Sequence, residues 1–323
     1  MQSGWLLSEW RDEMDELKVF SGNANRELAR RVCEFLKISP GSIEVSEFSD
    51  GETMVRFDEN VRGADVFVFQ STFPPASNLM ELLVMLDAAR RASARRVTAV
   101  VPYFGYARQD RKDQPRVPIT AKLVANLIAV AGADRVLTMD LHSAQIQGFF
   151  DIPFDHLYAA PVLIDHLKTK KFTNPVVVSP DIGSIKMARA FSKRLGAGLA
   201  LIDKRRPRPD VSEVVNVIGE VSGSDVVIID DLISTGGTIV TAAEVLKKNG
   251  ARRVLVGCTH PVFARDAVQR LDAAPIEEVF VTDTIPHAPG KLPGKFTVLS
   301  VADLLGEAVK RIHEERSLSS LFV

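Results

Sequence analysis

Two adjacent carboxylates and a glycine loop follow one apolar run in the second half of the chain. The run reads VVIIDDLISTGGT over 226–238, so Asp230 and Asp231 come directly after four β-branched residues. The small residues of the loop are Ser234, Thr235, Gly236, Gly237 and Thr238. A strand, a glycine loop and a helix N-terminus in that order form an anion cradle, because glycine lets N–H groups turn inward and the helix dipole adds positive potential.

The two carboxylates restrict the kind of anion that this loop could bind. They would repel a bare polyphosphate, and no G-x-x-x-x-G-K-[ST] sequence occurs anywhere in the chain. The pattern therefore predicts hydroxyls or a metal ion bound next to one phosphate, which is what a sugar phosphate presents.

A second group of candidate residues lies at 108–116, where RQDRKDQPR places four cations in nine residues. A solvated surface loop is the ordinary explanation of such a charge run. The run follows a predicted strand, however, and ligands of open α/β sheets bind at the carboxyl ends of strands. Arginine forks and a lysine there could close over a triphosphate and neutralise it.

Three further strand ends carry residues that could do chemistry. Lys204 and Arg206 lie in DKRRP after a predicted strand, where they could stabilise charge on a transferring phosphoryl group or form a basic surface turn. Asp181 lies in SPDIG, where it could bind a metal or simply cap the next helix. His142 ends another strand, and a lone histidine is weak support for a site.

Length and composition bound the class of protein. The chain has 323 residues, enough for two domains, and it is 46% hydrophobic and 25% charged. A formal net charge of −1 provides no global field for nucleic acid or anionic membrane. The two cysteines predict no disulfide framework, the first residues do not show the pattern expected of a signal peptide, and no apolar run is long enough to span a bilayer. These features predict a cytoplasmic globular protein with no nucleic-acid or membrane partner.

The elements that must position these residues alternate along the chain. The expected strands are 17–22, a hairpin over 43–57, 64–71, 95–106, 135–142, 175–180, 198–204, 213–222, 226–229, 254–263, 277–285 and 295–301. The expected helices are 25–37, 78–92, 118–133, 160–168, 185–196, 239–251 and 301–317. Strands that alternate with helices predict an α/β fold with parallel sheets covered on both faces.

The chain also matches itself. Residues 61–66 (VRGADV) correspond to 221–226 (VSGSDV) at an offset of 160, and 95–97 (RRV) correspond to 252–254 at an offset of 157. Two copies of one α/β unit explain these offsets, although A-x-R-V also recurs at the helix-to-strand join of 133–136. Only the second copy keeps the carboxylates and glycines, so we expect one sugar-phosphate cradle per chain.

Taken together, the motifs resemble those of the ribose-phosphate pyrophosphokinase (phosphoribosyl pyrophosphate synthetase) family. FSDGE, YARQDRKD, PITAKLVANL, MDLHSAQIQGFFDIP, SPDIG, IDKRRP and DDLISTGGT occur in family order from about Leu17 to the C-terminus. The resemblance implies two duplicated phosphoribosyltransferase-like (type I) domains, each a mostly parallel sheet flanked by helices. It divides the chain into an extension (1–16), an ATP-side domain (17–160, with a flexible loop at about 103–116 and the C-terminal helix 301–317) and a ribose 5-phosphate-side domain (161–300).

The resemblance also implies an activity and a set of roles. The family transfers pyrophosphate from Mg-ATP to the 1-hydroxyl of ribose 5-phosphate, which yields phosphoribosyl pyrophosphate and AMP. The residues implied for ATP are Phe48, Asp50, Gly51, Glu52, Arg108, Gln109 and His142. Those implied for ribose 5-phosphate are Arg206, Asp230, Asp231, Ser234, Thr235, Gly236, Gly237 and Thr238. Lys204, Arg206 and Arg108 would be catalytic, His142 and Asp181 would approach Mg2+, and the chain would form a homo-oligomer, a hexamer by family.

Two positions depart from the family pattern. Ser234 stands where relatives often carry aspartate, and Ser184 stands where they often carry glycine. Two alternative functions are a phosphoribosyltransferase that consumes phosphoribosyl pyrophosphate and a catalytically silent regulatory subunit. The duplication and the cationic loop oppose the first alternative, and the presence of Arg108, Lys204 and Arg206 opposes the second.

Overall fold

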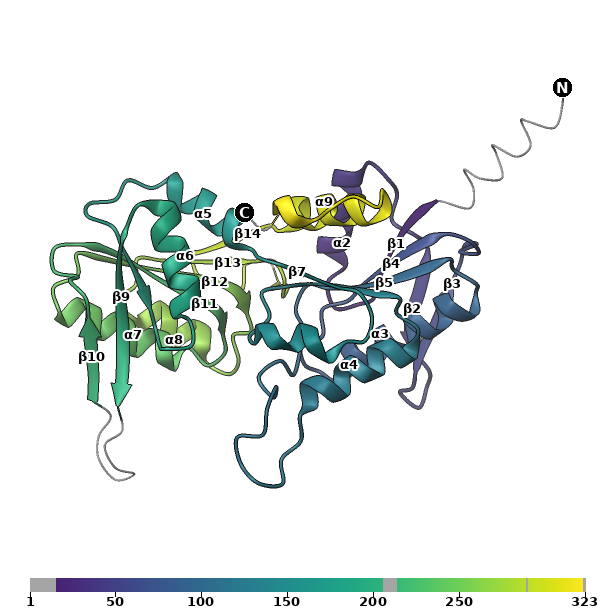
Figure 1. Ribbon diagram of the computed structural model, residues 1–323, viewed down its shortest axis with the longest axis horizontal. Coiled ribbons are helices and arrows are strands. Elements are labelled where there is room, and N and C mark those ends of the chain that lie inside the picture. The colour runs from purple at the N-terminus through teal and green to yellow at the C-terminus, as the bar shows by residue number, and fades with distance from the viewer. Residues whose placement is uncertain (1–15, 206–213, 289, 322–323) are drawn as a thin grey trace. The chain divides into compact units, whose positions relative to one another are not determined.

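The computed structural model describes residues 16–205, 214–288 and 290–321 (Figure 1). The chain divides into two compact units. The first comprises the described parts of Met1–Tyr158 and Val301–Val323 together with Thr284–Pro286, and the second comprises the described parts of Ala159–Asp283 and His287–Ser300. The predicted extension, apart from Glu16, and Arg206 lie outside the described residues.

The first unit is built on a five-stranded parallel sheet in the order β1-β4-β5-β6-β7. Its strands are β1 (Leu17–Ser21), β4 (Asp65–Phe69), β5 (Arg96–Val101), β6 (Arg135–Met139) and β7 (Phe154–Leu157). A separate antiparallel hairpin joins β2 (Ile43–Glu47) to β3 (Thr53–Phe57). Every residue of β4 is buried, because helices cover both faces of the sheet.

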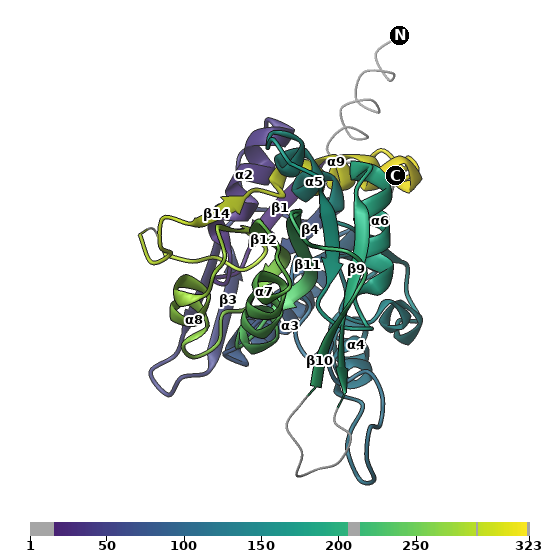
Figure 2. The same cartoon turned by 90° about the vertical axis from the view of Figure 1, so that its left-hand side faces the viewer.

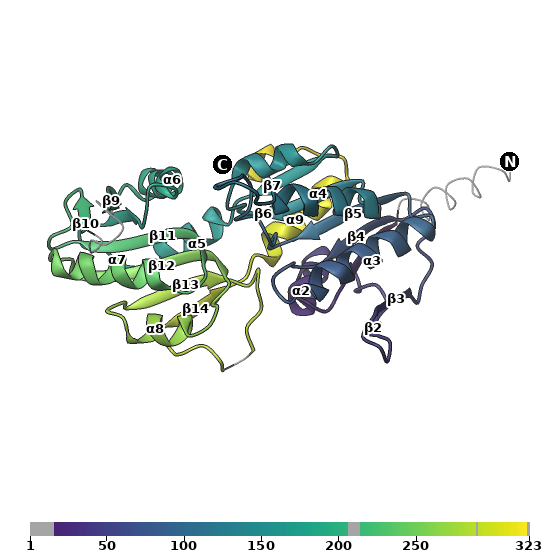
Figure 3. The same ribbon diagram turned by 90° about the horizontal axis from the view of Figure 1, so that it is seen from below.

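Helices α3 (Ser77–Arg91) and α4 (Thr120–Ala131) cover one face of this sheet, and Figure 3 shows them running across β4 and β5. Val66 and Val68 face them and pack in one cluster with Leu82 and Ile128. Asn25 is the N-cap of helix α2 (Arg26–Leu36), and its side chain accepts a hydrogen bond from the N–H of Leu28. This helix packs on β1.

The second unit is built on a seven-stranded sheet in the order β10-β9-β8-β11-β12-β13-β14. Its strands are β8 (Val176–Ser179), β9 (Gly198–Arg205), β10 (Val214–Ile218), β11 (Asp225–Ile233), β12 (Arg253–Pro261), β13 (Glu278–Thr282) and β14 (Phe296–Leu299). Only the β9–β10 pair is antiparallel. The predicted α/β class with two mostly parallel sheets is confirmed.

Strand β11 shows why this sheet needs helices on both sides. Val226 and Ile228 pack in one cluster with residues of α7 (Gly237–Lys248), whereas Val227 and Ile229 pack in another with Leu163 of α5 (Ala160–Lys168) and with α6 (Ile185–Leu195). Successive side chains of a strand point to opposite faces, so four consecutive apolar residues require two covered faces. Figure 2 shows α6 and α7 on opposite sides of the sheet.

The two units repeat one another in detail. The order β1-β4-β5-β6-β7 in the first sheet corresponds to β8-β11-β12-β13-β14 in the second. The N–H of Gly63 donates to the carbonyl of Ser93, and the N–H of Gly223 donates to that of Gly250, both at 2.9 Å. These two glycines have φ of 75° and 68°. The repeated topology and geometry support the duplication predicted from the sequence offsets.

Each unit contains the helix that follows the last strand of the other. Helix α5 follows β7 along the chain but packs on α6 in the second unit. Helix α9 (Ala302–His313) follows β14 but packs on α2 in the first unit. Gly306 of α9 lies against the ring of Phe35, where an added Cβ would be 2.4 Å from Cδ1. The two helices therefore approach closely at this glycine.

Several elements differ from expectation. Strand β7, helix α8 (Ala267–Ala273) and the short 3-10 helices at Ala144–Phe149 and Ser319–Leu321 were not predicted. Strand β11 continues to Ile233, so Asp230 and Asp231 lie within the strand and not after it. Across residues 16–205, 214–288 and 290–321, no helix combines the length and apolarity needed to cross a membrane.

Candidate active site

The predicted anion cradle lies in the second unit, where β11 gives way to α7. The helix begins at Gly237, two residues before the predicted start, and its first intrahelical bond joins the N–H of Val240 to the carbonyl of Gly236. Gly237 and Thr238 therefore lie in the first helical turn, whose N–H groups have no partner within the helix. Together with the helix dipole, these groups can bind a phosphate.

Gly236 shapes the turn into that helix. Its φ of 76° lies in the left-handed region, and an added Cβ would lie 3.4 Å from Cγ of Leu271 on α8. Residues with a Cβ adopt this conformation at a cost, so glycine suits this position. The carbonyl of Ser234 accepts a hydrogen bond from the N–H of Ala264 at 2.9 Å, which ties the start of the loop to the segment after β12.

Asp230 is the buried acid of the cradle. It is 9% exposed, and its Oδ1 accepts hydrogen bonds from the N–H of Asp231 at 3.0 Å and the hydroxyl of Ser184 at 2.7 Å. Burial raises the pKa of Asp230 well above its ordinary value, and repulsion from Asp231 and from Asp181 raises it further. Donors from a bound ligand would offset that repulsion, so the site is electrostatically prepared for hydroxyl groups or a cation.

Asp181 lies in the loop after β8, and β8 is the strand next to β11. Its Oδ1 accepts a hydrogen bond from the N–H of Ser184 at 3.1 Å, and its carbonyl accepts one from the hydroxyl of Ser179 at 2.7 Å. Ser184 therefore contacts both Asp181 and Asp230. The structure thus joins the SPDIG loop to the DDLISTGGT stretch, as two adjacent parallel strands should.

Lys204, one of the residues predicted to be catalytic, belongs to β9, the strand beside β8. Lys204 lies near the end of β9, where its backbone pairs with Val215 of β10. Leu201 pairs with Ser179 at the end of β8, so Lys204 lies three residues beyond that point, past the carboxyl end of β8. The predicted role of Arg206 concerns a residue outside the described part of the chain.

In the first unit, four of the predicted ATP residues form a single turn at the tip of the β2–β3 hairpin. The N–H of Phe48 donates to the carbonyl of Glu52 at 2.8 Å, and that of Gly51 donates to the carbonyl of Phe48 at 2.9 Å. Gly51 has a φ of 89°, and the N–H of Glu52 donates to Oδ1 of Asp50 at 3.1 Å. Phe48 is 56% exposed, so this hydrogen-bonded turn presents an aromatic ring to the solvent.

The other predicted ATP residues lie at the carboxyl edge of the first sheet. Arg108 and Gln109 belong to the segment between β5 and α4, and His142 follows β6. Asp110 joins these two segments, because its Oδ2 accepts hydrogen bonds from Ser143 Oγ at 2.6 Å and Gln145 Nε2 at 2.7 Å. The structure therefore brings Gln109 and His142 to one edge through their immediate neighbours.

Sequence reasoning did not single out Asp110, Ser143 or Gln145. Burial alone would raise the pKa of Asp110, but the hydrogen bonds from Ser143 and Gln145 outweigh it and leave the pKa below its ordinary value. The only signal in the sequence was the position of Asp110 inside the cation run, and that position does not reveal its partners.

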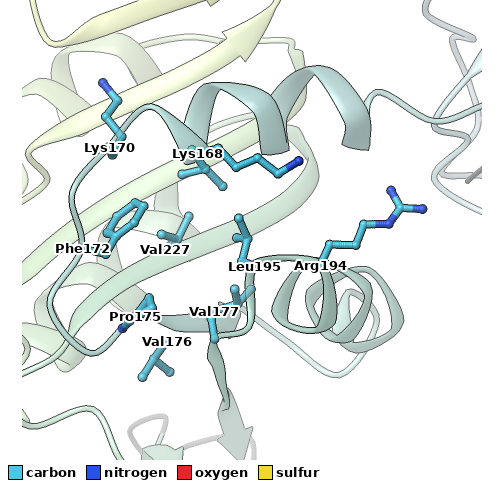
Figure 4. A pocket seen from close by; sticks show the side chains of 11 residues that line it. Lys168, Lys170, Phe172, Pro175, Val176, Val177, Arg194, Leu195 and Val227 are labelled. Carbon is cyan, nitrogen blue, oxygen red and sulfur yellow. The ribbon is translucent and has the colours of Figure 1, made fainter.

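A cavity of about 290 Å³ lies elsewhere in the second unit, between α5, α6 and β8 (Figure 4). Apolar side chains such as Leu167 and Val177 line it, and Lys168 and Arg194 stand at its rim. Val176 at the start of β8 also borders it. The cavity is thus at the amino end of the strand, opposite the end that carries Asp181.

The comparisons with known proteins agree with the motifs. Residues 17–132 match the family described as the N-terminal domain of ribose phosphate pyrophosphokinase, and residues 204–323 match the phosphoribosyl synthetase-associated domain. A ribose-phosphate pyrophosphokinase of Rhodopirellula baltica is 55% identical over 313 residues, which cover 96% of this chain and 99% of that protein. One of Agrobacterium fabrum is 55% identical over 309 residues, which cover 95% of this chain and all of that protein.

The chain belongs to the ribose-phosphate pyrophosphokinase family. The solved structure of phosphoribosylpyrophosphate synthetase from Mycobacterium smegmatis is similar as well, with 42% identity and a TM-score of 0.88. That match covers 93% of this chain and 99% of the other. The family resemblance and the enzyme class predicted from the motifs are therefore confirmed, and the alternative of a phosphoribosyltransferase is not supported.

As a ribose-phosphate pyrophosphokinase, the chain keeps the predicted family motifs at strand ends. DDLISTGGT and SPDIG end β11 and β8 of the second sheet, the described part of the IDKRR motif (202–205) ends β9, and MDLH ends β6 of the first sheet. Within the described residues, no three His, Cys, Asp or Glu side chains converge as a metal cage.

Proposed function

We propose that this family member transfers the β,γ-pyrophosphoryl group of Mg-ATP to the 1-hydroxyl of ribose 5-phosphate, which yields phosphoribosyl pyrophosphate and AMP. The observation that carries the proposal is the junction of β11 and α7, where the carboxylates of Asp230 and Asp231 precede the helix N-terminus. The carboxylates accept hydrogen bonds from the ribose hydroxyls. The residues that receive the 5-phosphate are Ser234, Thr235, Gly236, Gly237 and Thr238, through backbone N–H groups and hydroxyls.

ATP binds to residues of the first unit. The exposed ring of Phe48 packs on adenine, as aromatic rings do on flat heterocycles, and the turn that includes Asp50, Gly51 and Glu52 holds the ring in place. Arg108 and Gln109 bind the triphosphate, because a guanidinium fork matches phosphate oxygens. His142 lies at the same sheet edge and contacts the phosphates there.

The catalytic groups are cations and act by electrostatics. Lys204, Arg206 and Arg108 stabilise the charge that develops at the β-phosphorus as the sugar oxygen attacks in line, and Arg206 also binds ribose 5-phosphate. The protein holds donor and acceptor in that geometry, so no covalent enzyme intermediate is needed.

Mg2+ is the metal that the reaction requires, and it supplies charge neutralisation of the triphosphate when bound. The carboxylate of Asp181 is the hard oxygen donor that Mg2+ prefers, and the N–H of Ser184 orients it. Asp181 therefore fits the ion, with His142 as the second residue expected to approach it.

The functional protein is a homo-oligomer, a hexamer by family, and works in the cytoplasm. Helix α4 supports self-association, because its outer face exposes Leu123, Leu127 and Val130 at helical spacing, and exposed apolar stripes mark interfaces. Both cysteines, Cys33 and Cys258, are free and buried, which suits a reducing compartment. Sedimentation velocity measures the assembly directly.

One assay tests the activity. Purified protein is incubated with Mg2+, ATP and ribose 5-phosphate, and AMP and phosphoribosyl pyrophosphate are quantified, with omission of ribose 5-phosphate as the control. Equal amounts of both products are expected. Absence of AMP, with binding of ribose 5-phosphate intact by calorimetry, would favour the regulatory-subunit alternative.

A further inference from the structure

Ser184 connects two loops of the second unit that carry carboxylates. Its N–H donates to Oδ1 of Asp181 at 3.1 Å, and its hydroxyl donates to Oδ1 of Asp230 at 2.7 Å. Asp230 lies 46 residues further along the chain, on the strand beside the one that precedes Ser184. Ser184 thus binds Asp181 through its backbone N–H and Asp230 through its hydroxyl.

The usual explanation for a serine at this position does not account for that contact. Ser184 is the N-cap residue of α6, and N-cap serines commonly accept a hydrogen bond from an N–H of the first helical turn. Here the side chain makes no such bond, and the carboxylate of Asp181 accepts the N–H of Ser184 itself. The hydroxyl is therefore directed to Asp230 and not to the helix.

Ser184 has a backbone conformation that residues with a Cβ can adopt. Its φ of −86° and ψ of 2° lie at negative φ, in the bridge region that turn residues occupy, so a Cβ is tolerated at this position. A glycine would make the same backbone hydrogen bond to Asp181 but would supply no hydroxyl. The contact with Asp230 is thus a property of this side chain.

The effect on Asp230 follows from its surroundings. Asp230 is almost fully buried beside Asp231, and a buried carboxylate needs hydrogen-bond donors to stay in one orientation. Both the Ser184 hydroxyl and the N–H of Asp231 bind Oδ1. Two donors on Oδ1 fix the rotation of the carboxylate, and so the direction in which Asp230 faces a hydroxyl of the ligand.

We propose that Ser184 is a positioning residue of the pyrophosphokinase site, which orients Asp230 for the hydroxyls of ribose 5-phosphate. The inference rests on the proposed function of Asp230. Ser184 acts through Asp230 on the sugar, so its hydroxyl contributes to ribose 5-phosphate binding and leaves ATP binding unaffected.

The test compares three variants in kinetics and calorimetry. Ser184→Ala removes the hydroxyl and keeps the N–H that binds Asp181, whereas Ser184→Thr keeps both. Ser192→Ala is the matched control, because Ser192 lies on the same helix and its hydroxyl donates to the carbonyl of Ala197 at 2.7 Å. We expect Ser184→Ala to raise both KM and Kd for ribose 5-phosphate about tenfold, the size of a hydrogen bond to a charged group, with KM for ATP within about twofold of wild type.

The threonine variant should restore the affinity for ribose 5-phosphate, and Ser192→Ala should leave it unchanged. The proposal is overturned if Ser184→Ala behaves like Ser192→Ala, if Ser184→Thr is as impaired as Ser184→Ala, or if KM for ATP rises equally. If the wild-type protein forms no AMP, the proposed activity fails, and calorimetric titration with ribose 5-phosphate still decides the role of Ser184. Melting temperatures of all variants separate loss of folding from loss of binding.

Discussion

Nδ1 of His313, the last residue of α9, lies 2.9 Å from Oδ2 of Asp65 at the start of β4. Asp65 is fully buried, and Arg96 of β5 also binds both of its oxygens, at 2.8 and 2.5 Å. The guanidinium of Arg96 further donates to the carbonyl of Ile312 at 2.9 Å. One buried carboxylate thus links the sheet of the first unit to a helix that follows the last strand of the second.

Arg96→Ala should destabilise the first unit, because it leaves the buried charge of Asp65 with fewer donors. We expect a loss of about 3 kcal/mol in the free energy of unfolding, measured by urea denaturation. Arg90→Ala is the control, since Arg90 and Asp134 form a more exposed pair, and it should cost less than about 1 kcal/mol. Equal losses in the two variants would contradict a special role for Asp65.

The same carboxylate predicts how stability depends on pH. Burial alone would raise the pKa of Asp65, but hydrogen bonds from Arg96 and His313 outweigh it and lower the pKa below the ordinary value. The unfolded chain therefore binds the proton more readily, and the stabilisation is complete above about pH 4 and is lost as pH falls through the folded-state pKa. Asp65→Asn should flatten the acid side of a plot of unfolding free energy against pH between about 2 and 5; an unchanged slope would refute the assignment.

Gly257 predicts a packing effect in the second unit. It lies in the middle of β12, where an added Cβ would be 2.4 Å from ring carbons of Phe280 and 2.7 Å from Cδ1 of Ile229. Both neighbours are fully buried, so Gly257→Ala should cost about 1–3 kcal/mol of unfolding free energy. At Gly148 an added Cβ meets no heavy atom within 4 Å, so Gly148→Ala should change stability by less than about 0.5 kcal/mol.

Replacement of Asp230 and Asp231 by asparagine tests the acceptor site. The proposed contacts are to ribose hydroxyls. The double variant should therefore lower the affinity for ribose 5-phosphate by at least about tenfold and the affinity for ATP far less. Separate titrations with the two substrates measure this difference. Similar losses for both substrates would place the carboxylates outside a dedicated sugar site.

Lys204→Ala tests the proposed electrostatic catalysis. A cation that acts on the transition state should lower kcat by about 10²–10³-fold, with much smaller changes in KM. Steady-state kinetics with each substrate varied in turn give both parameters. An unchanged kcat would remove Lys204 from the catalytic groups.

The sequence by itself determined the fold class and the main motifs, because those features are local. Four consecutive β-branched residues before Asp230 predicted a buried strand, and Gly236 predicted the turn into a helix. The family motifs were equally readable, since each is a short run at a strand end. Their order along the chain was enough to predict the family that the comparisons confirm.

Elements that depend on distant partners were not predictable in this way. Strand β7 has the sequence FDHL, and its two polar residues do not fit the apolar pattern by which buried strands are predicted. Asp155 binds Arg135 at 2.5 Å, and Nε2 of His156 accepts a hydrogen bond from the N–H of Leu141 at 2.9 Å. A polar residue can occupy a sheet when a partner satisfies it, and the partner is visible only in the fold.

The tertiary structure also decided how the candidate site is held together. The sequence offered Asp181, Ser184 and Asp230 as members of two separate motifs, and Ser184 stood out only as a departure from glycine. Parallel pairing of β8 with β11 brings the motifs to one sheet edge, where the serine hydroxyl reaches Asp230. Hydrogen bonds act over about 3 Å, so contacts between residues 46 positions apart are set by strand pairing and not by local sequence.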